Sequence, residues 1–367
     1  MNLISMLKMT ALSTALLLVG CSSSTTTTIS SSKVSSNAVY SKPRTLDNFN
    51  DYVQFLKSKA AAEGVSASVL NAQNNIQYMQ KAVDLDRAQA GRSKRNSDQP
   101  QLPNPNGTTN YLNKVLTQNK VDIAEERYWE VQAPLQQASQ RYGVQQEYIL
   151  ALWGMESSFG HYQGSYDVLS ALATLAFDGR REALFSKEFV NAMEMLERDH
   201  IQRHRMLGSW AGAMGQTQFM PSAFLNYAAD GNNDSVKDIW TNQFDAFASI
   251  ANYLHTVGWD NKLPWGVEVI LNQPLDLSLS GIEKNKARSL SDWQSKGVTL
   301  ASFSQQEQDK LTALSQADLW LVRPDKEVGR AFLVSNNYRT ILDWNKSNYF
   351  GVSIGMFADR IKMATGL

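Results

Sequence analysis

The chain has 367 residues, in which 35 Lys and Arg balance 35 Asp and Glu, so its formal net charge is zero. A nucleic-acid-binding protein would be expected to carry a basic face, and this balance gives no sign of a nucleic-acid partner. One cysteine excludes an internal disulfide framework, while 43% hydrophobic residues are enough for a large core.

The first residues have the pattern of a secretory signal peptide. After Lys8, an apolar run extends from Ala11 to Val19 and is too short to cross a bilayer as a mature helix. The run ends in the letters LVGC, which resemble a bacterial lipobox, the motif whose cysteine receives a lipid and becomes the mature N-terminus. We therefore expect residues 1–20 to be a lipoprotein signal peptide and Cys21 to be the lipidation site. A plain secretory signal with an incidental cysteine is the alternative.

Residues 21–44 are rich in Ser and Thr and poor in apolar side chains. Such a segment cannot bury enough surface to fold, so it is expected to be a flexible tether between the lipid and the globular part. Ser22, rather than Asp, follows the cysteine. By resemblance to bacterial lipoproteins, this residue favours the outer membrane, with the protein facing the periplasm and attached to the membrane through its N-terminal lipid.

Helical spacing of apolar residues predominates from residue 45 to residue 264. Helices are predicted over 46–63, 66–90, 111–142, 168–176, 181–206 and 244–255. Residues 91–107, which read GRSKRNSDQPQLPNPNG, are rich in charges and helix breakers and predict a surface loop or mobile insertion.

A small β-containing module is predicted for residues 265–334. Alternating apolar residues or short apolar runs indicate strands near 267–271, 275–279, 319–322 and 330–334. Residues 335–367 return to helical spacing, with a helix over 348–364. The predicted fold class is therefore mainly α, as an α+β arrangement in which a small β module precedes the C-terminal helix.

A carboxylate interrupts one apolar stripe. Ile149, Leu152 and Trp153 recur at helical spacing, and the next position on the same stripe is Glu156. Beside an indole and away from water, the charged form of a carboxylate is disfavoured and its pKa rises. A carboxylic acid that stays protonated near neutral pH can act as the general acid in glycosidic cleavage. The stripe alone leaves a second interpretation open, a glutamate at a frayed helix end that reaches solvent.

A second unusual stretch is GSWAGAMGQTQFMPS at residues 208–222. Its small residues, two glutamines and closing proline are atypical of a helix and typical of backbone that approaches a ligand closely. Together with YGV at 142–144, WGMESSFG at 153–160, ALATL at 171–175, GRR at 179–181 and IANYLHTVGW at 250–259, it resembles the membrane-bound lytic transglycosylase B family. These peptidoglycan-cleaving enzymes have a lysozyme-like helical core, and the resemblance extends from about Thr45 to the C-terminus.

The resemblance implies roles for individual residues. The single catalytic acid of the family falls on Glu156. The positions that contact the saccharide fall on Tyr111, Ser209, Gln218, Tyr253 and Asn345. Trp344 stands where the family commonly has tyrosine, and residues 335–367 are expected to complete the catalytic groove.

Some members of the family hold calcium in an EF-hand-like loop after the QFMPS block. Positions one, three, five and nine of such a loop are Asp230, Asn232, Asp234 and Asp238. However, Ser235 replaces the usual glycine, and Thr241 replaces the bidentate carboxylate that ends the loop. A structural calcium would therefore bind weakly or not at all, and an Asx-rich turn is the alternative. No cofactor is required for the implied reaction.

Other candidate sites carry less weight. His200 and His204 have a spacing that could hold zinc on a helix, but they lack the acidic residue of a metalloprotease motif. Three further carboxylates could serve a hydrolytic mechanism, and surface charge is their alternative role: Asp167, Asp178 and Glu182.

The implied function is that of a lytic transglycosylase acting on peptidoglycan glycan strands. It would cleave the bond between N-acetylmuramic acid and N-acetylglucosamine without water and leave 1,6-anhydro ends. A hydrolytic lysozyme-type muramidase and a non-catalytic peptidoglycan-binding envelope lipoprotein remain the alternatives. The sequence identifies no protein partner.

The lipobox-like motif generates one testable prediction. Replacing Cys21 by Ala should move the protein from the membrane pellet to the soluble fraction, because no other residue of the N-terminal segment can carry the lipid. Fractionation of cells that express the wild type and the variant measures this. A variant that stays in the membrane pellet would show that the anchor lies elsewhere.

Overall fold

The structure is a computed structural model that describes residues 47–98, 104–199 and 201–367. The predicted signal peptide, Cys21 and the tether up to residue 44 lie outside these residues. No helix within the described residues is both long and apolar enough to cross a membrane. Helices predominate, and the strands form one two-stranded and one four-stranded sheet. The predicted mainly α class is confirmed.

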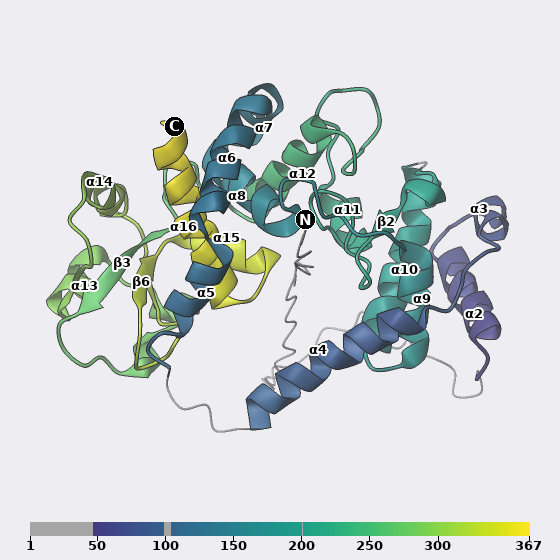
Figure 1. Cartoon of the computed structure of the whole chain (residues 1–367), viewed down its shortest axis with the longest axis horizontal. Coiled ribbons are helices and arrows are strands. Elements are labelled where there is room, and N and C mark those ends of the chain that lie inside the picture. The colour runs from purple at the N-terminus through teal and green to yellow at the C-terminus, as the bar shows by residue number, and fades with distance from the viewer. Residues whose placement is uncertain (1–46, 99–103, 200) are drawn as a thin grey trace, which may run out of the picture.

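The helices form two groups, each around its own hydrophobic core (Figure 1). The first group consists of α2 (Phe49–Ala62), α3 (Ala67–Ala72), α4 (Gln80–Asp98), α9 (Val168–Asp178), α10 (Glu182–Arg198) and α11 (Pro221–Tyr227). The second consists of α5 (Gly107–Val115), α6 (Gln118–Glu130), α7 (Gln132–Tyr142), α8 (Gln146–Ser157), α12 (Gln243–Thr256), α15 (Asn336–Trp344) and α16 (Asn348–Thr365). In Figure 1, α4 reaches from the first group toward the second.

The helix α8 lies at the centre of the second group. Its residues from Tyr148 to Gly154 are all buried, so the helix is enclosed on every side rather than along a single stripe. It packs against α6, α7, α12 and α16. A helix that is hydrophobic all round is expected in the interior of a protein, and its burial fixes the position of the residues at its C-terminal end.

The four-stranded sheet forms a separate small module. Its strands are β3 (Gly266–Leu271), β4 (Val298–Leu300), β5 (Trp320–Val322) and β6 (Ala331–Val334), in the order β4-β3-β6-β5 and all antiparallel. Val267, Leu321 and Leu333 face a third core that also contains Trp293 of α13 (Leu290–Ser295). The module therefore has a hydrophobic core of its own.

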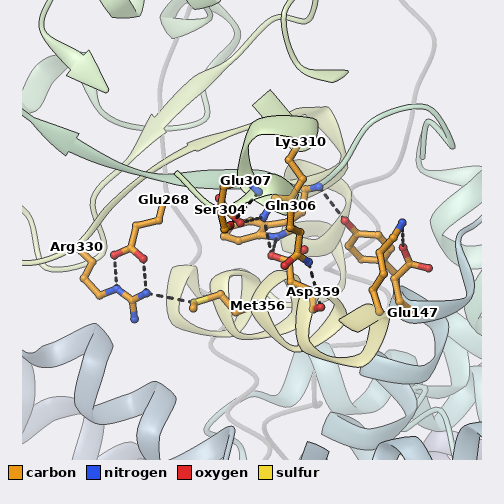
Figure 2. A network of polar contacts seen from close by, with 12 residues as sticks. Glu147, Glu268, Ser304, Gln306, Glu307, Lys310, Arg330, Met356 and Asp359 are labelled. Carbon is orange, nitrogen blue, oxygen red and sulfur yellow. Dashed lines mark hydrogen bonds and ion pairs between the residues drawn. The ribbon is translucent and has the colours of Figure 1, made fainter. Parts of the chain in front are cut away.

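Polar contacts attach this module to the C-terminal helix (Figure 2). The Lys310 ammonium, on α14 (Gln305–Ala313), donates to Asp359 of α16 at 2.7 Å. Arg330 donates two hydrogen bonds of 2.6 Å to Glu268 of β3 and contacts the Met356 sulfur of α16 at 3.6 Å. The bidentate pair with Glu268 fixes the Arg330 side chain within the module. The contacts of Lys310 with Asp359 and of Arg330 with Met356 then join the module to α16.

Several predicted boundaries were wrong. The helix predicted over residues 66–90 is broken between α3 and α4, where the backbone N–H groups of Gln77 and Met79 donate to Ser170 and Thr174 of α9, each at 3.0 Å. These tertiary hydrogen bonds replace helical ones. Conversely, α4 continues to Asp98, through part of the predicted loop 91–107, because the prolines that forbid a helix come only afterwards.

Other differences have local causes. The long helix predicted over 111–142 consists of α5, α6 and α7, and α6 begins where the Thr117 side chain accepts from the N–H of Lys120. The helix predicted over 181–206 ends at Arg198. Instead of a strand, residues 277–279 form a 3₁₀ turn, since the Asp276 carboxylate caps the N–H of Ser278 at 2.7 Å.

Replacing either of two helical glycines by alanine should have opposite effects on the free energy of unfolding. A Cβ at Gly355 of α16 would lie 2.1 Å from the Trp265 ring, whereas a Cβ at Gly91 of α4 would meet nothing within 4 Å. Gly355→Ala should lower the free energy of unfolding by about 2 kcal/mol or more through overpacking. Gly91→Ala should raise it by up to about 1 kcal/mol through helix propensity. Urea denaturation of both variants measures this, and a Gly355→Ala variant as stable as Gly91→Ala would contradict the packing described.

Candidate functional site

Glu156 lies in the last turn of α8, where the chain leaves the helix abruptly. Ser158 and Phe159 have left-handed backbone conformations, with φ of 50° and 59°. The Ser157 hydroxyl donates to the Trp153 carbonyl at 3.1 Å and accepts from the Gly160 N–H at 3.0 Å. These bonds close the helix end, so the carboxylate of Glu156 is held on an ordered turn rather than at a frayed terminus.

The carboxyl group of Glu156 is partly buried and accepts a hydrogen bond from an indole. The Trp344 indole Nε1 donates to Glu156 Oε1 at 3.0 Å. Burial raises the pKa of Glu156 to about 7, against the opposing effects of the indole hydrogen bond and of the Lys120 ammonium. Near neutral pH the group is therefore present in both forms, as acid and as carboxylate. A glutamate that merely reaches solvent would not have this environment.

An aromatic cluster holds Trp344 in place. The Trp344 ring lies 4.8 Å from the ring of Tyr253 on α12 and 5.2 Å from that of Phe219, centroid to centroid. Tyr227 of α11 lies 4.5 Å from Tyr253. Both Tyr253 and Trp344 pack against the first and the second helical cores. The donor to Glu156 is thus positioned by both helical groups at once.

The segment 208–222 folds into tight turns beside this cluster. Isolated β-bridges join Gly208 to Met214 and Met214 to Phe219. A Cβ at Gly208 would lie 2.4 Å from the Ala213 carbonyl oxygen, so no larger residue fits there. The turns present Phe219 to Trp344, with a ring-centroid distance of 5.2 Å. The close approach of this backbone to a ligand stays a prediction.

Two predicted contact residues of this segment stabilise the turns themselves. The Ser209 hydroxyl accepts from the N–H of Ala213 at 3.1 Å. Gln218 has a left-handed backbone, with φ of 52°, and its amide donates to the carbonyls of Gly215 and Gln163 at 2.9 and 3.1 Å. Both residues are partly exposed and lie on the segment that carries Phe219.

The remaining predicted contacts lie on the second helical group. The Tyr111 ring, on α5, lies 5.4 Å from that of Tyr349, and burial raises the pKa of Tyr111, with the Glu156 charge acting in the same direction. Asn345 directly follows Trp344 and its side-chain oxygen accepts from the N–H of Ser347 at 3.1 Å. The fold therefore brings residues from α5, α8, α12 and α15 together around one carboxyl group.

Sequence reasoning missed two residues that shape this site. The buried Gln216 side chain accepts from the Trp153 indole at 2.8 Å and donates to the Trp240 carbonyl at 3.1 Å, which ties α8 to the segment 208–222. Its place in a glutamine-containing stretch was the only available signal. The second is Lys120 of α6, whose ammonium acts electrostatically on Glu156. Nothing in the helical pattern of α6 distinguishes it from a surface lysine.

The loop considered for calcium has the expected turn but a poor set of ligands. Ser235 adopts the left-handed conformation, with φ of 69°, and its N–H donates to Asp230 at 2.8 Å. Asp238, however, accepts from Arg205 at 2.6 Å and from the Thr241 hydroxyl at 2.5 Å. The Arg205 guanidinium thus occupies the carboxylate at position nine, and a neutral hydroxyl replaces the bidentate carboxylate at position twelve.

Asn232 and Asp234 bind each other at 2.9 Å, and the described residues contain no acidic, histidine or cysteine cluster suited to a metal. Asp230, Asn232 and Asp234 still supply oxygen atoms, so weak calcium binding or none, as expected from Ser235 and Thr241, stays a prediction.

The other candidate groups are engaged elsewhere. Asp167 caps α9 and pairs with Arg203 at 3.0 Å. Asp178 pairs with Arg87, and Glu182 accepts from Tyr52 at 2.8 Å. His204 lies in a 3₁₀ turn after α10 rather than on a helix, and His200 is outside the described residues.

The chain is similar to proteins of known family. The family described as transglycosylase SLT domain matches residues 48–359. Membrane-bound lytic murein transglycosylase B of Escherichia coli is 36% identical over 157 residues, which are 42% of this chain and 43% of that protein. The chain thus aligns with less than half the length of this curated relative.

Solved structures agree with this similarity. SltB3 from Pseudomonas aeruginosa, in complex with NAG-anhNAM-pentapeptide, has a TM-score of 0.74 and 33% identity, over 86% of this chain and 80% of that one. The Escherichia coli lytic transglycosylase Slt35, solved in complex with calcium, has a TM-score of 0.69 and 24% identity, over 90% and 98% of the two chains. At that identity Slt35 supports the fold alone. The resemblance inferred from the sequence motifs is confirmed, and the chain belongs to the transglycosylase SLT domain family.

Proposed function

We propose that the protein is a lytic transglycosylase that cleaves the β-1,4 bond between N-acetylmuramic acid and N-acetylglucosamine in peptidoglycan. One observation carries the proposal. Glu156 has a pKa of about 7, and no carboxylate is among the groups that shift it. A lone carboxyl group poised between its two forms suits a reaction in which one residue acts first as acid and then as base.

In the first half of the reaction, protonated Glu156 donates its proton to the glycosidic oxygen as the bond to the muramic acid breaks. Positive charge develops on the sugar, and its own N-acetyl group can stabilise this charge in place of a second carboxylate. The Trp344 indole, which donates to Glu156, stabilises the carboxylate left behind.

In the second half, Glu156 accepts the proton of the 6-hydroxyl group of the same sugar. The oxygen of that hydroxyl attacks the anomeric carbon and closes the 1,6-anhydro ring. Because the nucleophile belongs to the substrate, its effective concentration greatly exceeds that of a single water molecule. Tyr111, Ser209, Gln218, Tyr253 and Asn345 are the proposed saccharide contacts. No cofactor takes part.

Two alternatives are less well supported. An inverting hydrolase needs a second carboxylate roughly 6.5–9.5 Å away to activate water, and a retaining one needs a nucleophile at about 5–5.5 Å. Asp167, Asp178 and Glu182 each have other partners, as described above. A binding protein without activity would have no need to bury an ionisable group at a cost in stability.

The comparisons support the substrate class. The relative from Escherichia coli is named as a murein transglycosylase, and SltB3 was solved with a disaccharide pentapeptide that contains an anhydro sugar. By similarity we propose peptidoglycan strands as the substrate. We further propose that residues 45–264 and 335–367 form the catalytic region around the module 265–334, and that Cys21 anchors the protein to the outer membrane from the periplasmic side.

The substitution Glu156→Gln tests the proposed role directly. It preserves size and hydrogen bonding but can neither donate nor recover a proton. Activity should fall by several orders of magnitude, since positioned proton transfer alone contributes roughly 10²–10⁴-fold and both halves of the reaction depend on it. Mass spectrometry of released muropeptides measures this, and wild-type products should end in 1,6-anhydromuramic acid. Reducing-end products would make the protein a hydrolase.

Glu147→Gln is the matched control. Glu147 is also a buried glutamate of α8 with a raised pKa, but it lies at the start of the helix and pairs with Lys362 at 3.4 Å. Its substitution should leave the products and the rate nearly unchanged. Substantial turnover by Glu156→Gln would remove Glu156 from the proposed mechanism.

The raised pKa of Glu156 also predicts a pH dependence of stability. Because the folded pKa, about 7, exceeds the ordinary value of 4.5, the folded state binds the proton more tightly than the unfolded state does. This contribution is fully present below the unfolded pKa and is lost as pH rises through 7. Glu156→Gln should therefore gain stability over the wild type between pH 5 and pH 8, by roughly 1–3 kcal/mol. Urea denaturation of the wild type and Glu156→Gln at pH 5 and pH 8 measures the two free energies of unfolding. If the variant and the wild type differ by the same amount at both pH values, the environment assigned to Glu156 is contradicted.

A further inference from the structure

Lys120 of α6 is a partly buried lysine beside the catalytic helix. Its Nζ lies 3.4 Å from the sulfur of Met155, the residue before Glu156, and 5.9 Å from the ring centroid of Phe357 on α16. No carboxylate oxygen lies within 4.0 Å of Nζ in the part of the chain that the structure describes. A thioether is only a weak acceptor, so this ammonium is held close to the site without an ion-pair partner.

The other charges of the neighbouring helix are engaged elsewhere. On α16, which packs against α6, Arg360 donates to the Leu116 carbonyl at 2.7 Å. Lys362 pairs with Glu147, and Asp359 pairs with Lys310. Lys120 therefore faces no compensating charge from this side.

Besides burial, two groups act on the Glu156 carboxyl, the Trp344 indole from α15 and the Lys120 ammonium from α6. Of these two, Lys120 is the one that carries a positive charge. Conversely, Glu156 is the charged group that acts on Lys120, where burial lowers the lysine pKa and Glu156 raises it.

This placement costs stability. Withdrawing an ammonium from water without an ion-pair partner is unfavourable, and a methionine could fill the same space beside Met155 and Phe357. A residue that is costly to the fold and adjacent to the reacting carboxyl is best explained by what it does for that carboxyl.

We propose that Lys120 is a positioning residue for the reaction, whose ammonium stabilises Glu156 in its carboxylate form between the two proton transfers. The inference rests on the proposed function. At that stage the proton of Glu156 has moved to the leaving oxygen, and the carboxylate must persist until it takes the proton of the 6-hydroxyl group. Lys120 gives and receives no proton; its charge makes the intermediate stage less costly.

The experiment compares Lys120→Met with Lys120→Arg in the full chain. Carbon-13 NMR of glutamate-labelled protein follows the titration of Glu156, which Glu156→Gln assigns. The midpoint should rise in Lys120→Met and stay near the wild-type value in Lys120→Arg. In the pH–rate profile, Lys120→Met should shift the falling limb to higher pH. It should also lower kcat by about threefold to tenfold, because one pKa unit is a tenfold change in the protonation equilibrium. KM should hardly change.

Lys310→Met is the matched control. Lys310 is also largely buried, but it is paired with Glu307 and Asp359 at 2.8 and 2.7 Å, far from the site in sequence and on a different module. Its loss should lower stability and leave the Glu156 midpoint unchanged. Lys120→Met should be at least as stable as the wild type.

Each result decides between roles. An unchanged Glu156 midpoint in Lys120→Met would overturn the proposal, as would a loss of stability like that of Lys310→Met. A higher KM with normal kcat would also overturn it and assign Lys120 to binding an anionic group of the substrate. The titration does not require activity, so an inactive wild type would refute the proposed function while the coupling between Lys120 and Glu156 could still be measured.

Discussion

The hydrogen bond from the Trp344 indole to Glu156 joins residues 188 positions apart, and the rest of the site depends on it. Glu156 is fixed by the buried helix α8, and Trp344 is fixed by aromatic contacts that involve both helical cores. The carboxyl group therefore lies where the two halves of the fold meet. Burial raises its pKa and the indole limits that rise, so the balance between them sets a value near neutrality.

Much of the fold could be predicted because the information was local. Helical spacing located most of the helices, alternation located β3, and the position of Glu156 on an apolar stripe anticipated its burial. Predicted helix boundaries were wrong where distant residues determined them. For example, Ser170 and Thr174 accept hydrogen bonds from backbone N–H groups that would otherwise have continued a helix. The strand predicted near residues 275–279 failed for a different reason. There the capping carboxylate of Asp276 outweighed an alternating apolar pattern, and a 3₁₀ turn formed.

The site was less predictable than the fold. Of the residues that the motif resemblance selected, Tyr253 packs against Trp344, and Tyr111 is electrostatically coupled to Glu156. Their contacts with a saccharide stay predictions. The resemblance could not identify Trp344 as the donor to Glu156, since neither residue of this pair carries a local sign of the other. Lys120 was invisible for a similar reason, because a lysine on a helix is ordinarily a surface residue and only tertiary packing distinguishes this one.

The order of the elements along the chain has a consequence for biosynthesis. The helix α8 is synthesised long before α15 and α16, the last two helices, and α16 packs directly against it. A chain that emerges N-terminus first, as during the export that the predicted signal peptide implies, can thus contain Glu156 before the indole that binds it or the helix that covers it, since the indole lies 188 positions later. Closure of the core around α8 must wait for these final, non-local contacts. The surroundings that raise the pKa of Glu156 are therefore complete only when α15 and α16 have been added. A chain truncated before α15 would contain Glu156 but lack these surroundings.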